Sequence, residues 1–289
     1  MRYLLNVTFI LSALSALLVI SGTATAQHAA RPAVLLDALE DARSVRASTL
    51  GNLFVVETGK NRIIKLNHEG VRRDSVGRLG SGDYQFDTPV AIDPTNELKI
   101  YIADRGNRRI QMFDRRLQYL STVGLPQRAG LGSSYRPVLI SADPIGRFYF
   151  YDDERNVVYR YDSNGQYDLD FELFSEEERI RPVSMAVIDE ELWVAGRRGE
   201  LLHRFSSGGS YRGFIYAPEP VVSIRARRGQ LWMLGTDHVL RVDASGDVLE
   251  SVRLPERRGR DHRWTSFELL AGHVYLLNSR SLVRIPMEQ

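Results

Sequence analysis

Six copies of one strand pattern, 39 to 48 residues apart, predict an all-β fold of the propeller type. Each copy reads apolar, aromatic and then two mostly apolar residues. The aromatic positions are Phe54, Tyr101, Tyr149, Trp193, Trp232 and Tyr275. A period of about 40 to 50 residues is typical of propeller blades, each of which is a four-stranded antiparallel sheet. The sequence therefore predicts a six-bladed β-propeller with one of these aromatic residues on the second strand of each blade.

A further strand-like run follows each aromatic segment after a polar turn, and we expect it to be the third strand of the blade. These runs cover residues 63–66, 110–113, 158–161, 202–205, 239–242 and 282–285. Most of them lead into a turn that ends in glycine, such as 67–70, where glycine allows the positive φ of a hairpin. The outer strands are expected near Val71, Leu117, Tyr167, Tyr211 and Val248. Four inner strands are expected to open with Pro89, Pro137, Pro182 and Pro220.

The sixth copy has no outer strand of its own in the sequence, which ends at Gln289. A strand-like run at residues 34–39 precedes the first copy, and pairing it with 282–285 would close the ring and remove two exposed sheet edges. We therefore expect one domain over residues 27–289, closed by an N-terminal outer strand. Two separate domains or an open β-solenoid are the alternatives.

Composition agrees with a globular fold and limits the kinds of partner. Hydrophobic residues make up 43% of the 289 residues and charged residues 26%, so a wholly disordered chain or a polytopic membrane protein is excluded. The formal charge of +2 does not indicate a nucleic-acid partner. There is no cysteine, which excludes disulfides, thiol catalysis and Cys-ligated metals.

The first 26 residues read as a secretory signal peptide. A cationic start is followed by an apolar run diluted with Ser and Thr, and by the small-x-small sequence at 24–26. Cleavage before Gln27 would give an exported protein, periplasmic or secreted, with no membrane association after cleavage. The alternative is a retained signal anchor, although the run is short for spanning a bilayer.

Residues 79–114 resemble an NHL repeat. The resemblance rests on the Gly-x-Gly sequence at 80–82, on Gln85 with Phe86, on Pro89 and on the turn sequence Asp-Arg-Gly-Asn-Arg-Arg-Ile at 104–110. The first copy keeps part of this turn, at 57–63, and the later copies keep mainly the strand pattern. The resemblance implies a six-bladed propeller similar to NHL and other exported bacterial propellers. Related propellers include lactonases, lyases, RNA-binding modules and interaction scaffolds, so it implies no single activity.

In a propeller, the loop before each inner strand and the turn between the second and third strands emerge on the same face, around the central channel. We expect the residues just before the inner strands to surround the channel mouth. They are Glu40, Thr88, Arg136, Arg181, Glu219 and Trp264. Two arginines beside an exposed indole would suit a carboxylated or sugar-like ligand. The alternative is that these are solvated loop residues, paired with neighbours such as Glu177, Glu178 and Asp261.

Metal ligands are sparse in the sequence. Only His238 and His262 are expected on the ligand face, with Asp237 and Asp261 beside them, and together they form the candidate site for a divalent metal. The metal-ligand pattern of gluconolactonase-like propellers and the three converging histidines of the lyases are not recognisable. No other cofactor is expected.

Basic side chains recur on the third strands, and we interpret them as structural. They are Lys65, Arg160, Arg204, Arg241 and Arg284, whose stems would pack between blades while their charged ends reach water or acids. No Gly-x-Ser-x-Gly elbow and no phosphate-binding loop followed by Lys-Ser/Thr is present. We therefore expect a monomeric propeller that binds a small anionic or sugar-like ligand, or another protein, at the channel mouth. The alternative is a metal-dependent enzyme of lactonase or lyase type on the same face.

Overall fold

The computed structural model describes residues 32–96, 98–124, 135–175, 177–256 and 263–287, and these residues form six four-stranded antiparallel sheets. The inner strands are β2 (Ala42–Ala47), β6 (Pro89–Asp93), β10 (Pro137–Ala142), β14 (Pro182–Ile188), β18 (Ser223–Arg227) and β22 (Ser266–Leu270). The second strands are β3 (Asn52–Glu57), β7 (Ile100–Asp104), β11 (Phe148–Asp152), β15 (Glu191–Gly196), β19 (Gln230–Leu234) and β23 (His273–Leu277). The six predicted blades are confirmed, and we number them by their inner strands in chain order.

The third strands are β4 (Arg62–Asn67), β8 (Arg109–Phe113), β12 (Val157–Tyr161), β16 (Leu201–Ser206), β20 (His238–Val242) and β24 (Leu282–Pro286). The outer strands are β5 (Arg72–Val76), β9 (Tyr119–Thr122), β13 (Tyr167–Glu172), β17 (Tyr211–Tyr216), β21 (Val248–Arg253) and β1 (Ala33–Leu36). One 3-10 turn, η1 (Thr58–Lys60), joins β3 to β4. Each inner strand contacts the inner strands of the two neighbouring blades, including β2 with β22, so the blades form a closed ring.

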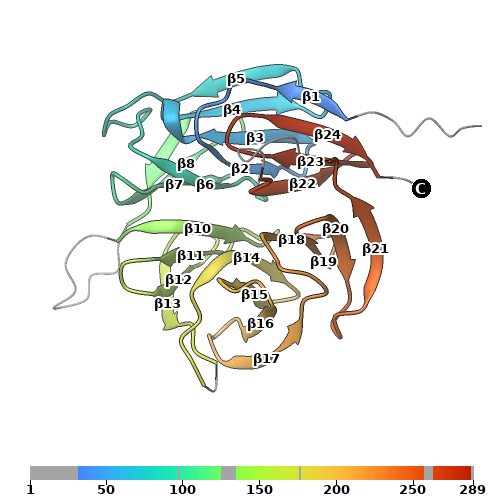
Figure 1. Cartoon of the computed structure of the whole chain (residues 1–289). Coiled ribbons are helices and arrows are strands. Elements are labelled where there is room, and N and C mark those ends of the chain that lie inside the picture. Colours follow the sequence, from blue (N-terminus) through green and yellow to red (C-terminus); the bar gives the residue numbers. More distant parts are fainter. Residues whose placement is uncertain (1–31, 97, 125–134, 176, 257–262, 288–289) are drawn as a thin grey trace, which may run out of the picture. The chain divides into compact units, whose positions relative to one another are not determined.

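The ring closes through strands from opposite ends of the chain. β1 pairs antiparallel with β24, with Ala33 opposite Arg284, Val34 opposite Val283 and Leu36 opposite Leu282 (Figure 1). This confirms the predicted outer strand of blade 6, but β1 ends at Leu36 because Ala38 takes a positive φ of 53° and turns the chain toward blade 1. Two other boundaries differ from the prediction. Leu117 lies in a turn with φ of 58°, and β18 begins three residues after Pro220.

The hydrophobic core lies mainly between neighbouring blades. The aromatic residue of every second strand is at most 5% exposed, and each of the six clusters of buried side chains combines strands of two adjacent blades. Complete burial of side chains of this size stabilises the fold by about 1.5–3 kcal/mol each. The packing therefore fixes each blade against the next.

The basic residues of the third strands lie opposite the aromatic residues of the second strands. In register they pair Lys65 with Phe54, Arg160 with Tyr149, Arg204 with Trp193, Arg241 with Trp232 and Arg284 with Tyr275. In blade 2 the partner of Tyr101 is Met112. Arg204 lies over the Trp193 ring and forms an ion pair with Glu191. Arg241 lies over the Trp232 ring and forms an ion pair with Glu250. The structural interpretation of this set is confirmed.

Within the described residues, no helix is both long and apolar enough to cross a bilayer.

Candidate functional site

A buried carboxylate stands at the end of the second strand in blades 1, 2 and 3. It is the third residue after the aromatic position: Glu57, Asp104 or Asp152. Each is 0% exposed and is neutralised by an arginine of the following turn or strand, Arg62, Arg109 or Arg155. Burial raises the pKa of Asp104, although hydrogen bonds from Asn107, the Asp87 N–H and Arg109 act in the opposite direction. These carboxylates accept backbone N–H groups, so they hold the loop before the inner strand in blades 1 and 2 and the turn after the second strand in blade 3.

Blades 5 and 6 keep an acceptor at the same place with different residues. In blade 6 it is Asn278, which accepts the N–H groups of Arg280 and Ser281 at 2.8 Å each. In blade 5 the strand ends at a glycine position, Gly235, and Glu219 from the preceding loop enters instead. The Glu219 carboxylate accepts the N–H groups of Asp237 and His238 at 3.2 and 3.1 Å.

Among the described residues, blade 4 has no such acceptor. Its residue at this position is Gly196, and the atoms nearest to a Cβ there would belong to His203 and Ile180, at 3.5 Å or more. No carboxylate among the described residues takes the place that Glu219 takes in blade 5. A cavity of about 270 Å³ opens here, lined by residues 178–181 before β14, by the 196–201 turn and by His203. We call it the blade-4 pocket.

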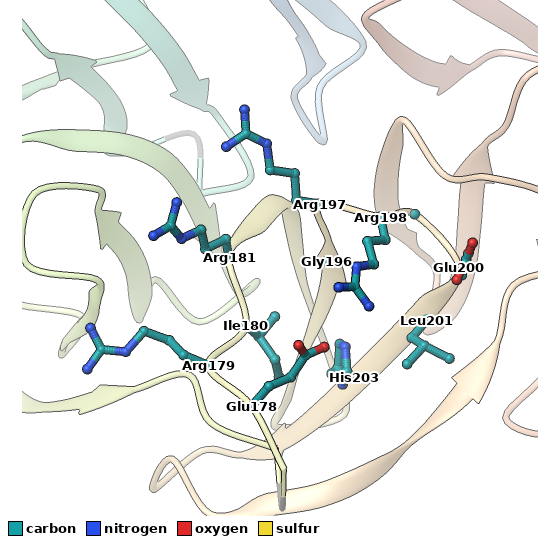
Figure 2. A pocket seen from close by; sticks show the side chains of 11 residues that line it. Glu178, Arg179, Ile180, Arg181, Gly196, Arg197, Arg198, Glu200, Leu201 and His203 are labelled. Atoms are coloured by element: carbon teal, nitrogen blue, oxygen red, sulfur yellow. The ribbon is translucent and has the colours of Figure 1, made fainter.

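Cations dominate the rim of this pocket. Arg181, Arg197 and Arg198 line it, and none of the three forms an ion pair with an acid of the described residues. A fourth arginine, Arg179, is engaged elsewhere, because it pairs with Glu172 and lies over the Phe174 ring. Figure 2 shows Arg198 and Glu178 reaching toward His203, whereas Arg179, Arg181 and Arg197 point away from it.

His203 forms the inner wall of the pocket and is 5% exposed. Its Nδ1 lies 3.3 Å from the Tyr211 hydroxyl, and its Nε2 faces the space beside Gly196. Burial lowers the pKa of His203, with a smaller opposing effect of Glu178, so the ring is neutral at pH 7. When the Tyr211 hydroxyl donates to Nδ1, Nε2 carries the proton and donates into the pocket.

The predicted channel-mouth residues do not form one group. Arg181 lines the blade-4 pocket, whereas Arg136 pairs with Asp153 and Glu40 with Lys60. Glu219 holds the blade-5 turn, and Thr88 takes a positive φ and donates its N–H to Asn61. Arg136 and Glu40 are therefore loop residues that form ion pairs with neighbours, as the alternative interpretation held. Their partners, Asp153 and Lys60, differ from those expected.

The prediction of an exposed indole at Trp264 was wrong. Trp264 is 8% exposed and packs with Trp232, Leu254 and Phe267 in the core between blades 5 and 6. The indole covers apolar surface at the junction of these two blades. For a large aromatic side chain, burial of this kind is more favourable than exposure at the channel mouth.

The metal prediction is tested only in part. His238 Nδ1 lies 3.7 Å from Glu219 Oε1, and the Asp237 side chain is exposed. His262 and Asp261 lie outside the described residues. Among the residues that are described, no group of three or more His, Asp or Glu side chains is arranged to hold a metal ion.

Gly196, Arg197, Arg198 and His203 were not predicted as site residues from the sequence. The signal that could have found them is the interruption of the acidic column at the end of the second strands. Glu57, Asp104 and Asp152 precede Gly196 at equivalent positions, and two arginines follow the glycine directly. His203 was noted only as a residue of a third strand, because the sequence does not show which cavity such a ring faces.

The other cavities differ in their charges. A cavity of about 470 Å³ lies between blades 5 and 6 on the opposite face and is lined by Arg227, Arg228 and Arg241, of which Arg241 is paired with Glu250. At the propeller centre, Arg46 contacts Asp93 and Glu268, and Arg225 is buried against backbone carbonyls and serine hydroxyls. Burial lowers the pKa of Arg225 to about 9, so it keeps its charge at pH 7. The small space beside these two arginines is only about 80 Å³.

Comparison with known proteins supports the fold and the repeat. No family model matches the chain. The human NHL repeat-containing protein 3 is 32% identical over 68 residues, which is 22% of this chain and 20% of that protein. The matched segment thus spans about a fifth of the length of that relative, in agreement with an NHL-like repeat in one part of the chain.

Solved structures with the same fold include enzymes. A gluconolactonase from Xanthomonas campestris superposes with a TM-score of 0.65 at 14% identity, covering 89% of this chain and 90% of that one. The virginiamycin B lyase of Staphylococcus aureus gives a TM-score of 0.59 at 14% identity, covering 86% and 80%. At such identities the likeness establishes the propeller fold alone.

Proposed function

We propose that this chain is an exported binding propeller that takes a small anionic ligand in the blade-4 pocket. The observation that carries the proposal is the set of three arginines, Arg181, Arg197 and Arg198, around one cavity without acidic partners among the described residues. Guanidinium groups bind carboxylates and phosphates through paired hydrogen bonds. Export rests on the leader-like residues 1–26, and a monomer is expected.

The size of the pocket agrees with a small molecule. Its volume of about 270 Å³ is near the lower end of ligand pockets, which run from roughly 300 to 1,000 Å³. Apolar contacts from Ile180 and Leu201 accompany the arginines, and His203 supplies a neutral polar group. An ion alone would need no such wall, so an organic anion fits better than an inorganic one.

The test is a thermal-shift screen of small organic anions, because a ligand of the native state raises the melting temperature by mass action. Any hit is then titrated calorimetrically against Arg198→Gln, with Arg212→Gln as the matched control. Arg212 is an exposed arginine on the outer strand of the same blade. We expect Arg198→Gln to weaken binding and Arg212→Gln to leave it unchanged. Equal binding by both variants, or no stabilisation by any anion, would refute the proposal.

The second candidate is an enzyme of lactonase or lyase type, and one observation favours it. In the tautomer whose Nδ1–H donates to the Tyr211 hydroxyl, His203 directs an unprotonated Nε2 into the arginine-lined pocket, which is the placement of a general base beside an anionic substrate. The gluconolactonase and the lyase show that this fold supports such chemistry in other proteins. Conversion of a bound hit over hours, measured by NMR and lost in His203→Gln, would favour the enzyme. Metal bound to protein prepared without added metal would favour a metal-dependent enzyme.

A further inference from the structure

We infer that the blade-4 pocket is a vacant carboxylate position of the repeat, and that the ligand fills it with a carboxylate group of its own. The inference rests on the proposed function and names its ligand class. It starts from what the other blades place at the end of their second strands.

The acceptor in blades 3, 5 and 6 binds the same two backbone groups. Asp152 accepts the N–H groups of the residues two and three positions after it, Glu154 and Arg155. Asn278 accepts those of Arg280 and Ser281, again two and three positions later. Glu219 accepts the N–H groups two and three positions after Gly235. The turn between the second and third strands thus repeatedly presents N–H donors to one oxygen-bearing group.

Blade 4 keeps a donor of this set, but none of its described residues supplies the acceptor. The residue two positions after Gly196 is Arg198, whose backbone N–H has no hydrogen-bond partner among the described residues. The next N–H, of Gly199, turns back to the Gly196 carbonyl at 2.8 Å. The Arg198 side chain and His203 border the same space. A carboxylate there would accept the Arg198 N–H and would meet a guanidinium, as Asp152 meets that of Arg155 in blade 3.

Blade 5 shows that the carboxylate need not belong to the strand. The Glu219 side chain arrives from a loop and lies where a side chain on Gly235 would lie, with its Oε1 2.1 Å from the position of a Cβ. A carboxylate from outside the blade is therefore accepted at this position. In blade 4 the corresponding space is open, and a ligand can take the role that Glu219 has in blade 5.

The charges favour a carboxylate over a phosphate. A phosphate monoester carries about −1.5 to −2 charges near pH 7, whereas a carboxylate carries one. Glu178 and Glu200 also line the pocket, and Glu178 lies close enough to influence His203. These two acids oppose a second negative charge, and the neutral His203 ring adds a hydrogen bond without adding positive charge.

Gly196 itself provides the sharpest test, because its backbone and surroundings admit a side chain. A Cβ would make ordinary contacts, 3.5 Å from His203 Nε2 and 3.7 Å from Ile180 Cγ2, and the residue has no positive φ. Gly196→Asp would restore the carboxylate that blades 1 to 3 carry in their own sequence and so occupy the position from within. Gly196→Ala is the matched control, which adds the Cβ without the charge.

The experiment compares two series of anions by calorimetry and by amide NMR. The aromatic series is benzoate, phenyl phosphate and benzenesulfonate, and the aliphatic series is propionate, ethyl phosphate and ethanesulfonate. We expect carboxylates to bind and to shift the Arg198 amide. Gly196→Asp should weaken binding roughly 10- to 100-fold, since a charge-assisted hydrogen bond of this kind contributes about 1.5–3 kcal/mol, and Gly196→Ala should retain it.

Three results would overturn the inference. Equal or tighter binding of the phosphates or sulfonates would reject the carboxylate class while leaving the anion-binding function in place. Unchanged binding in Gly196→Asp would reject the placement of the ligand carboxylate beside Gly196, again leaving the anion-binding function in place. Failure of every anion to bind wild-type protein would reject the proposed function itself. If Gly196→Asp does not fold, the Arg198 amide shift in the wild type decides, and its absence on carboxylate binding counts against the inference.

Discussion

Glu219 places its carboxylate in the space beside Gly235 that a side chain at that position would need. The distance from Glu219 Oε1 to the position of a Cβ on Gly235 is 2.1 Å, so a side chain at position 235 and the Glu219 carboxylate cannot occupy this space together. The glycine admits the carboxylate, and the carboxylate in turn accepts the N–H groups of Asp237 and His238. Blade 4 has the equivalent glycine, Gly196, and no described residue takes the place of Glu219 there.

We predict that Gly235→Ala destabilises the protein by about 1–3 kcal/mol, because a Cβ would expel Glu219 and leave two backbone N–H groups without their acceptor. Gly196→Ala should change the free energy of unfolding by no more than about 0.5 kcal/mol, since its Cβ would meet only van der Waals contacts. Urea denaturation of both variants measures the difference. Equal losses would contradict the assignment of Glu219 as the group that holds the blade-5 turn.

The fold could be predicted from sequence because each blade repeats the same physical requirement. An aromatic residue such as Tyr101 or Trp193 must be buried between neighbouring blades, so the pattern recurs at a nearly fixed period. Ring closure followed from the need to cover the edge of β24. Strand ends such as Leu36 depended on local backbone turns at Ala38, which the apolar pattern does not encode.

The site could be predicted only in part, because it arises from an absence. Arg181 was identified from its place before an inner strand, and it lines the pocket. Trp264 was assigned to the mouth by the same rule, yet its surroundings bury it. Whether a loop residue faces solvent depends on which apolar surface the adjoining blades leave uncovered, and this is a tertiary property. The interruption at Gly196 is present in the sequence, but only the hydrogen bonds of the other blades show that an acceptor of backbone N–H groups belongs at this position.

Deletion of residues 33–36, which form β1, should leave the edge of β24 unpaired and remove Leu35 and Leu36 from the core between blades 6 and 1. We expect loss of the cooperative unfolding transition and concentration-dependent aggregation, because a free strand edge pairs with other chains. Light scattering and circular dichroism during heating measure both effects. A monomeric truncated protein with the melting temperature of the intact one would contradict closure of the ring through β1.

Arg160 tests the role of the third-strand cations. Its side chain pairs with Asp168 and donates to the Ser207 carbonyl of blade 4, and its backbone lies in register with Tyr149. Arg160→Ala should reduce the free energy of unfolding by about 1–2 kcal/mol, and Arg160→Met should recover part of the loss because it keeps the apolar stem. If the two variants are equally destabilised in urea, the stem contributes no packing and the charged end carries the whole effect.

The pH dependence of stability should carry a contribution from His203. Burial lowers its pKa in the folded protein below the ordinary value of 6.5, so between these two values the unfolded chain binds a proton that the native protein does not. This contribution to stability is complete above pH 6.5 and is lost as the pH falls toward the native pKa, with a slope of at most about 1.4 kcal/mol per pH unit. His203→Gln should remove that part of the slope. Urea unfolding of both proteins between pH 5 and pH 7.5 gives the difference, in which titration of the other groups cancels. Parallel profiles would show that the pKa of His203 is the same in the folded and unfolded protein and that water reaches the ring in the blade-4 pocket.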